Sequence, residues 1–387
     1  MAANRAHTDL IPTLSHMVAM PTVSGRPMDE LAAYLAERME ARGVRVERYE
    51  VAPGRCNVVG RVGPRNGRGV VLSGHLDVVP TEGQNWSTDP YKLVEVDGAL
   101  QGRGSCDMKG FVAAATCALD DIDPTSLREE LVLMWTCEEE VGCAGSRALV
   151  ERYRAELGDL PSATIVGEPT GLQVCRMHPG HTTLRVSIRG RSAHSSRPEL
   201  GLNAIQLAQP VLSALADLEQ QLRLARRDIP ELERPWVVLN VGRIQGGTAI
   251  NIVPEHCTVE LGLRPLPGQT ATQMLALVQD ALEGCRSAAE ARGGALEVTL
   301  LLDAPALLTP AGTSLEAALL PLARSPIVGG VPFATDAGNL ERLGLSCLIF
   351  GPGSIDLAHR PDERVPIDQL FATHGALAAL IGASARS

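Results

Sequence analysis

Histidines and carboxylates stand at or just after the ends of several predicted β-strands in this chain. His75 follows the apolar run 70–72, and an acidic triplet at 138–140 follows the apolar run 131–135. Three further residues hold similar positions: Asp107, Glu168 and His359. The set offers two imidazoles and several carboxylates, which is the ligand mix that holds a pair of divalent metals in a hydrolase.

Each member of the set also has a simpler interpretation. A lone histidine such as His75 is more often a structural residue, but Asp77 lies two positions on and can accept the second ring N–H. An acidic triplet is often a solvated helix start, and Asp107 can simply cap the helix that follows it. The triplet comes straight off an apolar strand, however, which disfavours exposure of all its carboxylates. The metal interpretation is favoured because the simpler one needs a separate coincidence for every segment.

The segments around these residues alternate between strands and helices. Apolar spacing predicts a helix over 29–42, and two strands joined by a hairpin turn are predicted over 58–62 and 69–72. The continuous apolar run within the second strand is typical of a strand that is buried on both faces of an α/β sheet. Ligands bind beyond the carboxyl ends of strands in such sheets, so residues far apart in the chain can converge there.

The middle of the chain has a different pattern. Residues 183–189 alternate between apolar and polar side chains, as a strand with one exposed face does. The elements that follow are a helix over 201–226 that Pro210 kinks or divides, strands over 236–243 and 256–263, a helix over 270–292 and a strand over 296–302. This β-α-β-β-α-β order predicts a ferredoxin-like unit. We therefore expect an α/β catalytic domain over 1–177 and 304–387, with this unit inserted over 178–303.

Composition and charge exclude several classes of protein. A chain of 387 residues is long enough for two domains, and its formal charge of −10 argues against nucleic acid or an anionic membrane as a partner. The nine cysteines form no C-x-x-C pair, which indicates reduced thiols in a cytoplasmic protein. Residues 1–10 are polar and no apolar run reaches about 18 residues, so we expect neither a secretory signal nor a membrane span.

The chain resembles the co-catalytic zinc deacylases and exopeptidases, a family that includes acetylornithine deacetylase, succinyl-diaminopimelate desuccinylase and glutamate carboxypeptidase. The resemblance covers nearly the whole chain and is carried by the motifs SGHLDVVP (73–80), GRGSCDMKG (102–110), TCEEEVGCAGS (136–146), VGEPT (166–170), GRSAHSSRPELGLNAI (190–205) and GPGSIDLAHRPDE (351–363). The last motif, with LRPLPG (263–268), is most similar to the acetylornithine deacetylase branch. The resemblance implies a mixed-sheet, zinc-exopeptidase-like catalytic domain with an inserted dimerisation or lid domain.

Carried over residue by residue, the resemblance also implies a pair of metal sites. Asp107 bridges the two metals, His75 and Glu168 complete one site, and Glu140 and His359 complete the other. Oxygen ligands with one imidazole per metal suit Zn²⁺, and Co²⁺ or Mn²⁺ can substitute. We therefore expect two divalent metal ions per subunit.

The same resemblance assigns the proton transfer to the acidic triplet. Glu139 is the general base that takes a proton from the metal-bridging water and delivers it to the leaving amine, while Asp77 orients the histidine two residues before it. A register shifted by one residue is an alternative, because the family has two or three acids at this place. The spacing to Val141-Gly142 favours Glu139 as the base and the next glutamate as the ligand.

The inserted domain is expected to complete the site. His194 matches the histidine that, in the family, reaches the neighbouring subunit's active site, which implies a homodimer through this domain. Asn251 and Arg264 fall at positions expected to contact substrate, and the guanidinium suits the α-carboxylate of an amino acid. Asp336, in the catalytic domain, can either accept a δ-ammonium group or cap the helix that follows it.

These features predict a metal-dependent amidohydrolase whose partner is a small N-acyl amino acid. The branch resemblance favours removal of acetate from N²-acetyl-L-ornithine, a step of arginine biosynthesis that yields L-ornithine. N-succinyl-diaminopimelate, N-acetylcitrulline or a dipeptide are alternatives. A non-catalytic relative is disfavoured because every ligand position and Glu139 are present, and serine or nucleotide chemistry because the chain has no G-x-S-x-G or P-loop motif.

Overall fold

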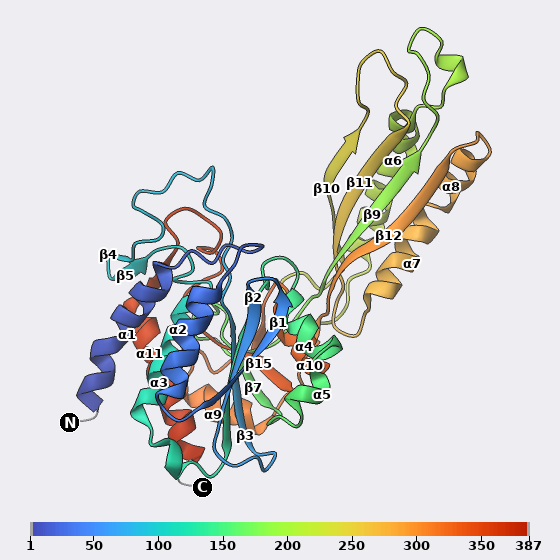
Figure 1. Ribbon diagram of the computed structural model, residues 1–387. Helices are drawn as coiled ribbons and strands as arrows, with labels where there is room; N and C mark the ends of the chain where they lie inside the picture. The colour runs from blue at the N-terminus through green and yellow to red at the C-terminus, as the bar shows by residue number, and fades with distance from the viewer. Residues whose placement is uncertain (1–2, 385–387) are drawn as a thin grey trace. The chain divides into compact units, whose positions relative to one another are not determined.

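The computed structural model describes residues 3–384 and divides into two compact units, each of which we treat by itself (Figure 1). The first unit spans residues 1–177, 309–330 and 335–387, and the second spans residues 178–308 and 331–334. Met1 and Ala2, which begin the polar N-terminal stretch, lie outside the described residues. The mixed α/β fold class predicted from the sequence is confirmed.

A large mixed sheet forms the centre of the first unit. Its strands lie in the order β1 (Arg45–Ala52), β2 (Arg55–Val62), β6 (Glu130–Thr136), β3 (Gly69–His75), β7 (Ala163–Val166), β15 (Ser346–Ile349) and β8 (Cys175–His178), with β14 (Gly329–Gly330) beside β8. The central strands β6, β3, β7 and β15 run parallel. Their carboxyl ends therefore meet at one edge of the sheet, where ligands bind in open α/β folds.

The predicted hairpin between residues 58–62 and 69–72 is wrong, because β6 lies between these two strands. β2 pairs antiparallel with β6 and β3 pairs parallel with it, from Gly69 opposite Glu130 to His75 opposite Thr136. The short connection crosses the start of β6, where the main-chain oxygen of Arg68 accepts a hydrogen bond from the Glu130 N–H. Gly69 has φ +129°, and a Cβ there would meet the Glu130 oxygen at 1.9 Å, so only glycine permits this crossing.

Helices cover both faces of the sheet (Figure 1). One face carries α1 (Ala3–Val18), α2 (Asp29–Glu40), α3 (Lys109–Ala118) and α11 (Ile367–Ser384). The other carries α4 (Ala144–Glu151), α5 (Arg154–Leu157) and α10 (Ala337–Glu341). The short helix α9 (Ser314–Leu319) adds Leu315 and Leu319 to the main apolar core. The main apolar core joins the first set to the sheet through fully buried side chains such as Leu35, Phe111, Leu133 and Leu377. A small second sheet consists of β4 (Val94–Val96), β5 (Ala99–Gln101) and β16 (Arg364–Pro366).

The second unit has the predicted β-α-β-β-α-β order. Its elements are β9 (His181–Arg189), α6 (Ala204–Leu224), β10 (Val238–Gly246), β11 (His256–Arg264), α7 (Ala271–Ala281), α8 (Glu283–Glu290) and β12 (Ala295–Ala304). The two-residue strand β13 (Leu307–Leu308) follows β12 and ends the large sheet beside β8. The sheet order β10-β11-β9-β12 places the first strand of the motif beside the last, with every pair antiparallel. Pro210 lies within α6 without dividing it, whereas the helix predicted over 270–292 is broken at Leu282.

Two features of the chain bear on its chemistry and surroundings. Each of the nine cysteines lies among the described residues and is a free thiol. Among the described residues, no helix combines the length and apolar character needed to cross a bilayer.

Candidate metal centre

The carboxyl ends of β3, β6 and β7 bring the predicted ligands to one place. His75 is the last residue of β3 and lies opposite the last residue of β6, while Ser73 lies opposite Val166, the last residue of β7. Glu168 follows β7 after Gly167, whose Cβ position would lie 1.9 Å from the ring of Phe111. Glycine is therefore required there, because the strand end packs directly against the helix that follows Asp107.

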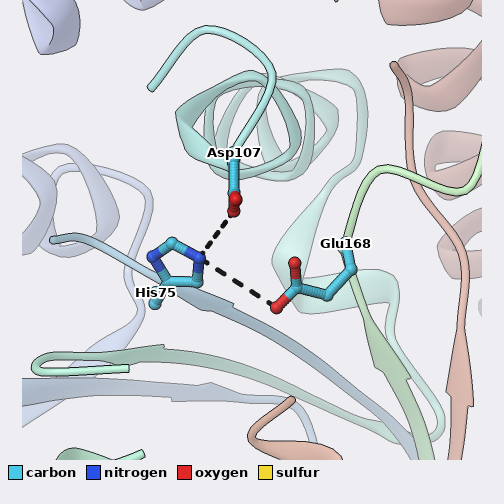
Figure 2. A group of neighbouring side chains, drawn as sticks. All are labelled: His75, Asp107 and Glu168. Atoms are coloured by element: carbon cyan, nitrogen blue, oxygen red, sulfur yellow. Dashed lines mark hydrogen bonds and ion pairs between the residues drawn. The ribbon is translucent and has the colours of Figure 1, made fainter. Parts of the chain in front are cut away.

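His75, Asp107 and Glu168 form a buried group that can hold one metal ion (Figure 2). The Nε2 atom of His75 lies 2.9 Å from Oδ1 of Asp107 and 4.0 Å from Oε1 of Glu168. The side chains are 1%, 5% and 4% exposed, respectively. Figure 2 shows all three pointing toward a common centre from the end of β3, the turn before α3 and the loop after β7.

The second nitrogen of His75 fixes its tautomer. Nδ1 lies 2.9 Å from the main-chain oxygen of Asp77, which can only accept, so Nδ1 carries the hydrogen. Despite burial, the hydrogen bond from Nε2 to Asp107 raises the pKa of His75 well above its ordinary value. A metal ion would displace the Nε2 proton, and neutral His75 would then offer Nε2 as a ligand. The sequence pointed to the Asp77 carboxylate for this role, but that group lies 3.8 Å from Nδ1.

Asp107 also belongs to a second group, with Glu140 and His359. The Nε2 atom of His359 lies 3.2 Å from Oδ2 of Asp107 and 2.9 Å from Oε2 of Glu140. The two oxygens of Asp107 thus face different imidazoles, since Oδ1 faces His75. This arrangement matches a carboxylate that serves two metal ions, as the sequence predicts for Asp107.

Contacts of the acidic triplet show which of its members face the two groups. Glu138 turns away: Arg55 Nη1 lies 2.7 Å from Glu138 Oε2, and Oε1 accepts the Gly25 N–H at 2.8 Å. The Asp77 carboxylate accepts the N–H groups of Glu139 and Glu140 at 3.0 and 3.2 Å. Asp77 therefore supports His75 through its main chain and holds the triplet through its side chain.

Glu139 lies beside Cys143 and Asp336 in a third cluster of potential ligand atoms. The Cys143 Sγ donates to Glu139 Oε1 over 3.4 Å, and burial together with the nearby glutamate raises the pKa of this thiol well above its ordinary value. A protonated thiol donates hydrogen bonds and does not ligate a metal as a thiolate would. We therefore interpret this cluster as the support of the Glu139 carboxylate.

Asp336 does not cap the helix that follows it. It occupies the N-cap position of α10 without a side-chain capping bond, and Thr335 accepts the Ala337 N–H instead. The two Asp336 oxygens accept hydroxyl hydrogen bonds of 2.5 Å from Thr136 and Ser146. The capping alternative is wrong, and the contact of Asp336 with a substrate ammonium stays a prediction.

The electrostatics of the centre favour positive charge. Burial raises the pKa of Glu168 and of Glu139 well above the ordinary value, and burial with Asp107 raises the pKa of Glu140 to about 7. Hydrogen bonds to Asp107 and Glu140 raise the pKa of His359 to about 10. Clustered buried carboxylates resist ionisation unless a cation compensates them. Two divalent cations would supply that compensation, so the donor set fits the metals that the sequence predicts.

The remaining predicted residues belong to the second unit. His194 is exposed, with Nδ1 2.7 Å from the Ser196 hydroxyl. Its main chain forms an isolated antiparallel β-bridge with Ile252. The Asn251 main-chain oxygen accepts the Ser195 N–H at 3.0 Å. Arg264 ends β11 and lines a cavity of about 230 Å³. Their roles toward a substrate stay predictions.

Residues that the sequence analysis did not single out hold the Asp107 loop in place. Glu363 Oε1 accepts the N–H groups of Cys106 and Asp107, each over 3.0 Å. The other oxygen lies 2.6 Å from Nη1 of Arg103, and both side chains of this pair are 1% exposed. Glu363 ends the last motif and Arg103 lies in the second. Their opposite charges within two family motifs were the signal available in the sequence.

Comparison with known proteins defines the class of this protein. Residues 71–383 match Peptidase family M20/M25/M40, and the chain belongs to that family. It is therefore a hydrolase of amide bonds, from a family of metal-dependent peptidases and amidohydrolases.

Solved structures share the fold along almost the whole chain. A tripeptidase from Staphylococcus aureus subsp. aureus Mu50 is 22% identical, with a TM-score of 0.79 over 98% of this chain and 99% of that one. A metallo-carboxypeptidase of the M20 family from Sulfolobus solfataricus is 18% identical, with a TM-score of 0.79 over 98% and 100%. A dinuclear metal-binding M20 peptidase from Bacillus subtilis is 17% identical, with a TM-score of 0.69 over 98% and 99%. At these identities the likeness shows a common fold and leaves the substrate open.

Proposed function

We propose that this protein is a two-metal amidohydrolase that removes the acetyl group from N²-acetyl-L-ornithine. The observation that carries the proposal is the pair of three-residue ligand groups that share Asp107, with Glu139 alongside. His75 and Glu168 hold one ion, and Glu140 and His359 hold the other. Zn²⁺ is the proposed resident ion because each group combines one imidazole with carboxylates, and Co²⁺ or Mn²⁺ can substitute.

The bound cations would lower the pKa of the attacking water and stabilise the negative charge that develops on the amide oxygen. Glu139 takes the proton of that water and later delivers it to the leaving amine. This protonation is needed because the nitrogen would otherwise leave as an anion, which is too poor a leaving group. Burial raises the pKa of Glu139, which makes the carboxylate a better proton acceptor than an exposed glutamate. The Cys143 thiol and the N–H bond to Asp77 hold Glu139 in orientation.

The substrate is the finer part of the proposal. Acetylornithine is favoured by the motifs 351–363 and 263–268. Arg264 lies at the edge of a cavity that also contains Trp236 and Val238, and we assign its guanidinium to the substrate α-carboxylate with Asn251 as a second contact. Asp336 is the proposed partner of the δ-ammonium group. Other acyl amino acids or a dipeptide form the second candidate class, which the tripeptidase and carboxypeptidase of similar fold favour.

A panel of substrates tests this proposal directly. Protein reconstituted with Zn²⁺ or Co²⁺ would be assayed for steady-state hydrolysis of acetylornithine, acetylcitrulline, succinyl-diaminopimelate and a set of dipeptides, with metal-free protein as the control. We expect the highest kcat/KM for acetylornithine and no hydrolysis without metal. Strong hydrolysis of another member beside negligible turnover of acetylornithine would reject the substrate, and failure to bind metal would reject the mechanism.

We also propose a cytoplasmic homodimer formed through the second unit. The nine free thiols support a reducing compartment. The outer strand β10 exposes most of its residues, which supports pairing with a second copy. In the dimer, the partner subunit's His194 would hold the carbonyl oxygen of the substrate. His194→Ala should lower kcat by about tenfold or more while the dimer and both metals persist, because one donor to the developing charge is lost. An unchanged kcat would remove this histidine from the site.

A further inference from the structure

Two loops that carry candidate metal ligands are connected by a chain of polar contacts outside the ligand groups, buried at its Arg103–Glu363 end and partly exposed at its Gln84 end. The chain begins at the loop of Asp107, where Glu363 Oε1 accepts the main-chain N–H groups of Cys106 and Asp107. Glu363 Oε2 accepts from Arg103 Nη1 over 2.6 Å. Because both members of this ion pair are 1% exposed, they have little freedom to rearrange without losing a charged partner.

Gln84 continues the chain to the second loop. Its Oε1 atom accepts hydrogen bonds from Arg103 Nη2 over 2.6 Å and from Trp86 Nε1 over 3.0 Å. Its Nε2 atom donates to the main-chain oxygen of His359 over 3.0 Å. The Trp86 ring lies against the Arg103 guanidinium, with 5.0 Å between the guanidinium carbon and the ring centroid. Both the oxygen and the nitrogen of the Gln84 side-chain amide are thus used: the oxygen accepts on the side of the first loop and the nitrogen donates to the second.

His359 depends on such support more than the other ligands do. Its side chain is 50% exposed, whereas the Asp107 and Glu140 side chains are 5% and 6% exposed. Its backbone has φ +62°, a conformation that a non-glycine residue adopts only when its surroundings hold it. A hydrogen bond to the His359 carbonyl oxygen therefore fixes the backbone from which the ligand projects.

We propose that Gln84, Arg103 and Glu363 are positioning residues that set the separation of Asp107 and His359 and thereby build the second metal site. Glu363 fixes Asp107 itself, which both ligand groups share. Gln84 fixes only His359, through the one bond that its amide donates. This inference rests on the proposed function, in which Asp107, Glu140 and His359 hold an ion.

The assignment predicts that the two ends of the chain of contacts have different effects on metal binding. Gln84→Glu keeps the acceptor for Arg103 and Trp86 but removes the donor to His359, and Gln84→Met removes both. Each variant should bind one equivalent of Zn²⁺ as wild type does and the other about 10–100-fold more weakly, as is typical when the support of a metal ligand is lost. Glu363→Gln should weaken both equivalents, because Asp107 serves both groups.

Calorimetric titration of metal-free protein with Zn²⁺, checked by elemental analysis of bound metal, measures these affinities without an activity assay. Glu82→Gln is the matched control. Glu82 lies in the same loop as Gln84 and forms an exposed ion pair with Arg26, so its loss should leave both affinities unchanged. Melting temperatures show whether each variant is folded; if Glu363→Gln does not fold, the two Gln84 variants decide the question alone.

The inference and the proposed function fail in different ways. Wild-type protein that does not bind two equivalents of Zn²⁺ would reject the function. Wild-type binding of two equivalents, with the same affinities in both Gln84 variants, would reject the inference and leave the function intact. The inference would also be rejected if Gln84→Met weakened the second equivalent and Gln84→Glu did not, or if both equivalents weakened together in the Gln84 variants.

Discussion

The two ligand groups of this protein have similar donors but are held in different ways. The group of His75, Asp107 and Glu168 is almost fully buried and stands at the ends of β3 and β7, whose register fixes the main chain. The group of Asp107, Glu140 and His359 stands on loops, and its histidine is half exposed. Strand ends need little further support, whereas loop ligands depend on side chains that fix their backbone, such as those of Asp77 and Gln84. The chain thus combines a buried group near strand ends with a half-exposed group on loops, and the two groups share one carboxylate.

Asp107→Asn should have the largest effect, because it alters both groups at once. An amide has one acceptor oxygen where the carboxylate has two, and it lacks the charge that both ions require. We expect loss of both metal equivalents and turnover no higher than that of metal-free protein, measured by metal analysis and steady-state rates. Asp123→Asn, in an exposed turn, is the control. Retention of either metal at wild-type affinity would show that the groups do not share this carboxylate.

Glu139→Gln separates the two groups from the proton transfer. The glutamate belongs to neither group, so both metals should bind normally while kcat falls about 10²–10⁴-fold through loss of the general base. Single-turnover kinetics with both metals bound would measure the effect, with exposed Glu151→Gln on α4 as the control. A rate close to wild type would assign the proton transfer to another residue.

Alanine variants of the two histidines compare the groups directly. His75→Ala leaves the Asp77 main-chain oxygen and Oδ1 of Asp107 without their partner in the interior, so we expect about 1–3 kcal/mol of lost stability together with the loss of one metal. His359→Ala should lose the other metal with little change in the melting temperature of the metal-free protein, since that ring is half exposed. Equal destabilisation by the two variants would contradict the distinction between a buried and an exposed group.

The pH dependence of the metal-free protein gives the smallest expected effect. The pKa of Glu140 rises from 4.5 to about 7 on folding, so the folded state binds more protons than the unfolded state between these pH values. The contribution of Glu140 to stability is therefore fully present below about pH 4.5 and is lost as pH rises toward 7, and the raised pKa values of Glu139 and Glu168 act in the same direction. The lowered pKa of Asp107 acts in the opposite direction, but only at pH values below the ordinary range of an aspartate. We expect the melting temperature to be a few degrees lower at the upper end of this range, and Zn²⁺ to remove the difference. A melting temperature that rises with pH in metal-free protein would contradict this charge balance.

Patterns that act locally were predictable from the sequence. The alternation in β9 and the order of the elements that follow it gave the ferredoxin-like unit, because a strand with one exposed face imposes a two-residue period. The hairpin between β2 and β3 could not be judged in this way. Both strands are apolar, and a short loop between two strands does not reveal that a third strand, 55 residues further along, lies between them.

The candidate site shows the same division. Residue type and position after strands identified His75 and Glu168, because parallel strands must bring their carboxyl ends together. Asp107 and His359 do not directly follow a parallel strand, and the family motifs identified them. The direction of each side chain depended on contacts that cross the chain. Arg55 and Gly25 turn Glu138 away from the centre, and Thr136 and Ser146 occupy Asp336.

The sequence by itself therefore determined the class of chemistry, since only a few residue types can bind divalent metals and their spacing along strands and loops is local. The tertiary structure decided which carboxylates join the candidate ligand groups and which contacts hold them there. Three adjacent glutamates are chemically identical; spacing within the motif favoured a register, and the contacts of Glu138 with Arg55 and Gly25 show that it is the one turned away. Likewise, Glu363 contacts the Asp107 loop and Gln84 contacts the His359 loop only after folding. The partners lie far apart in the chain, and no local sequence pattern relates them.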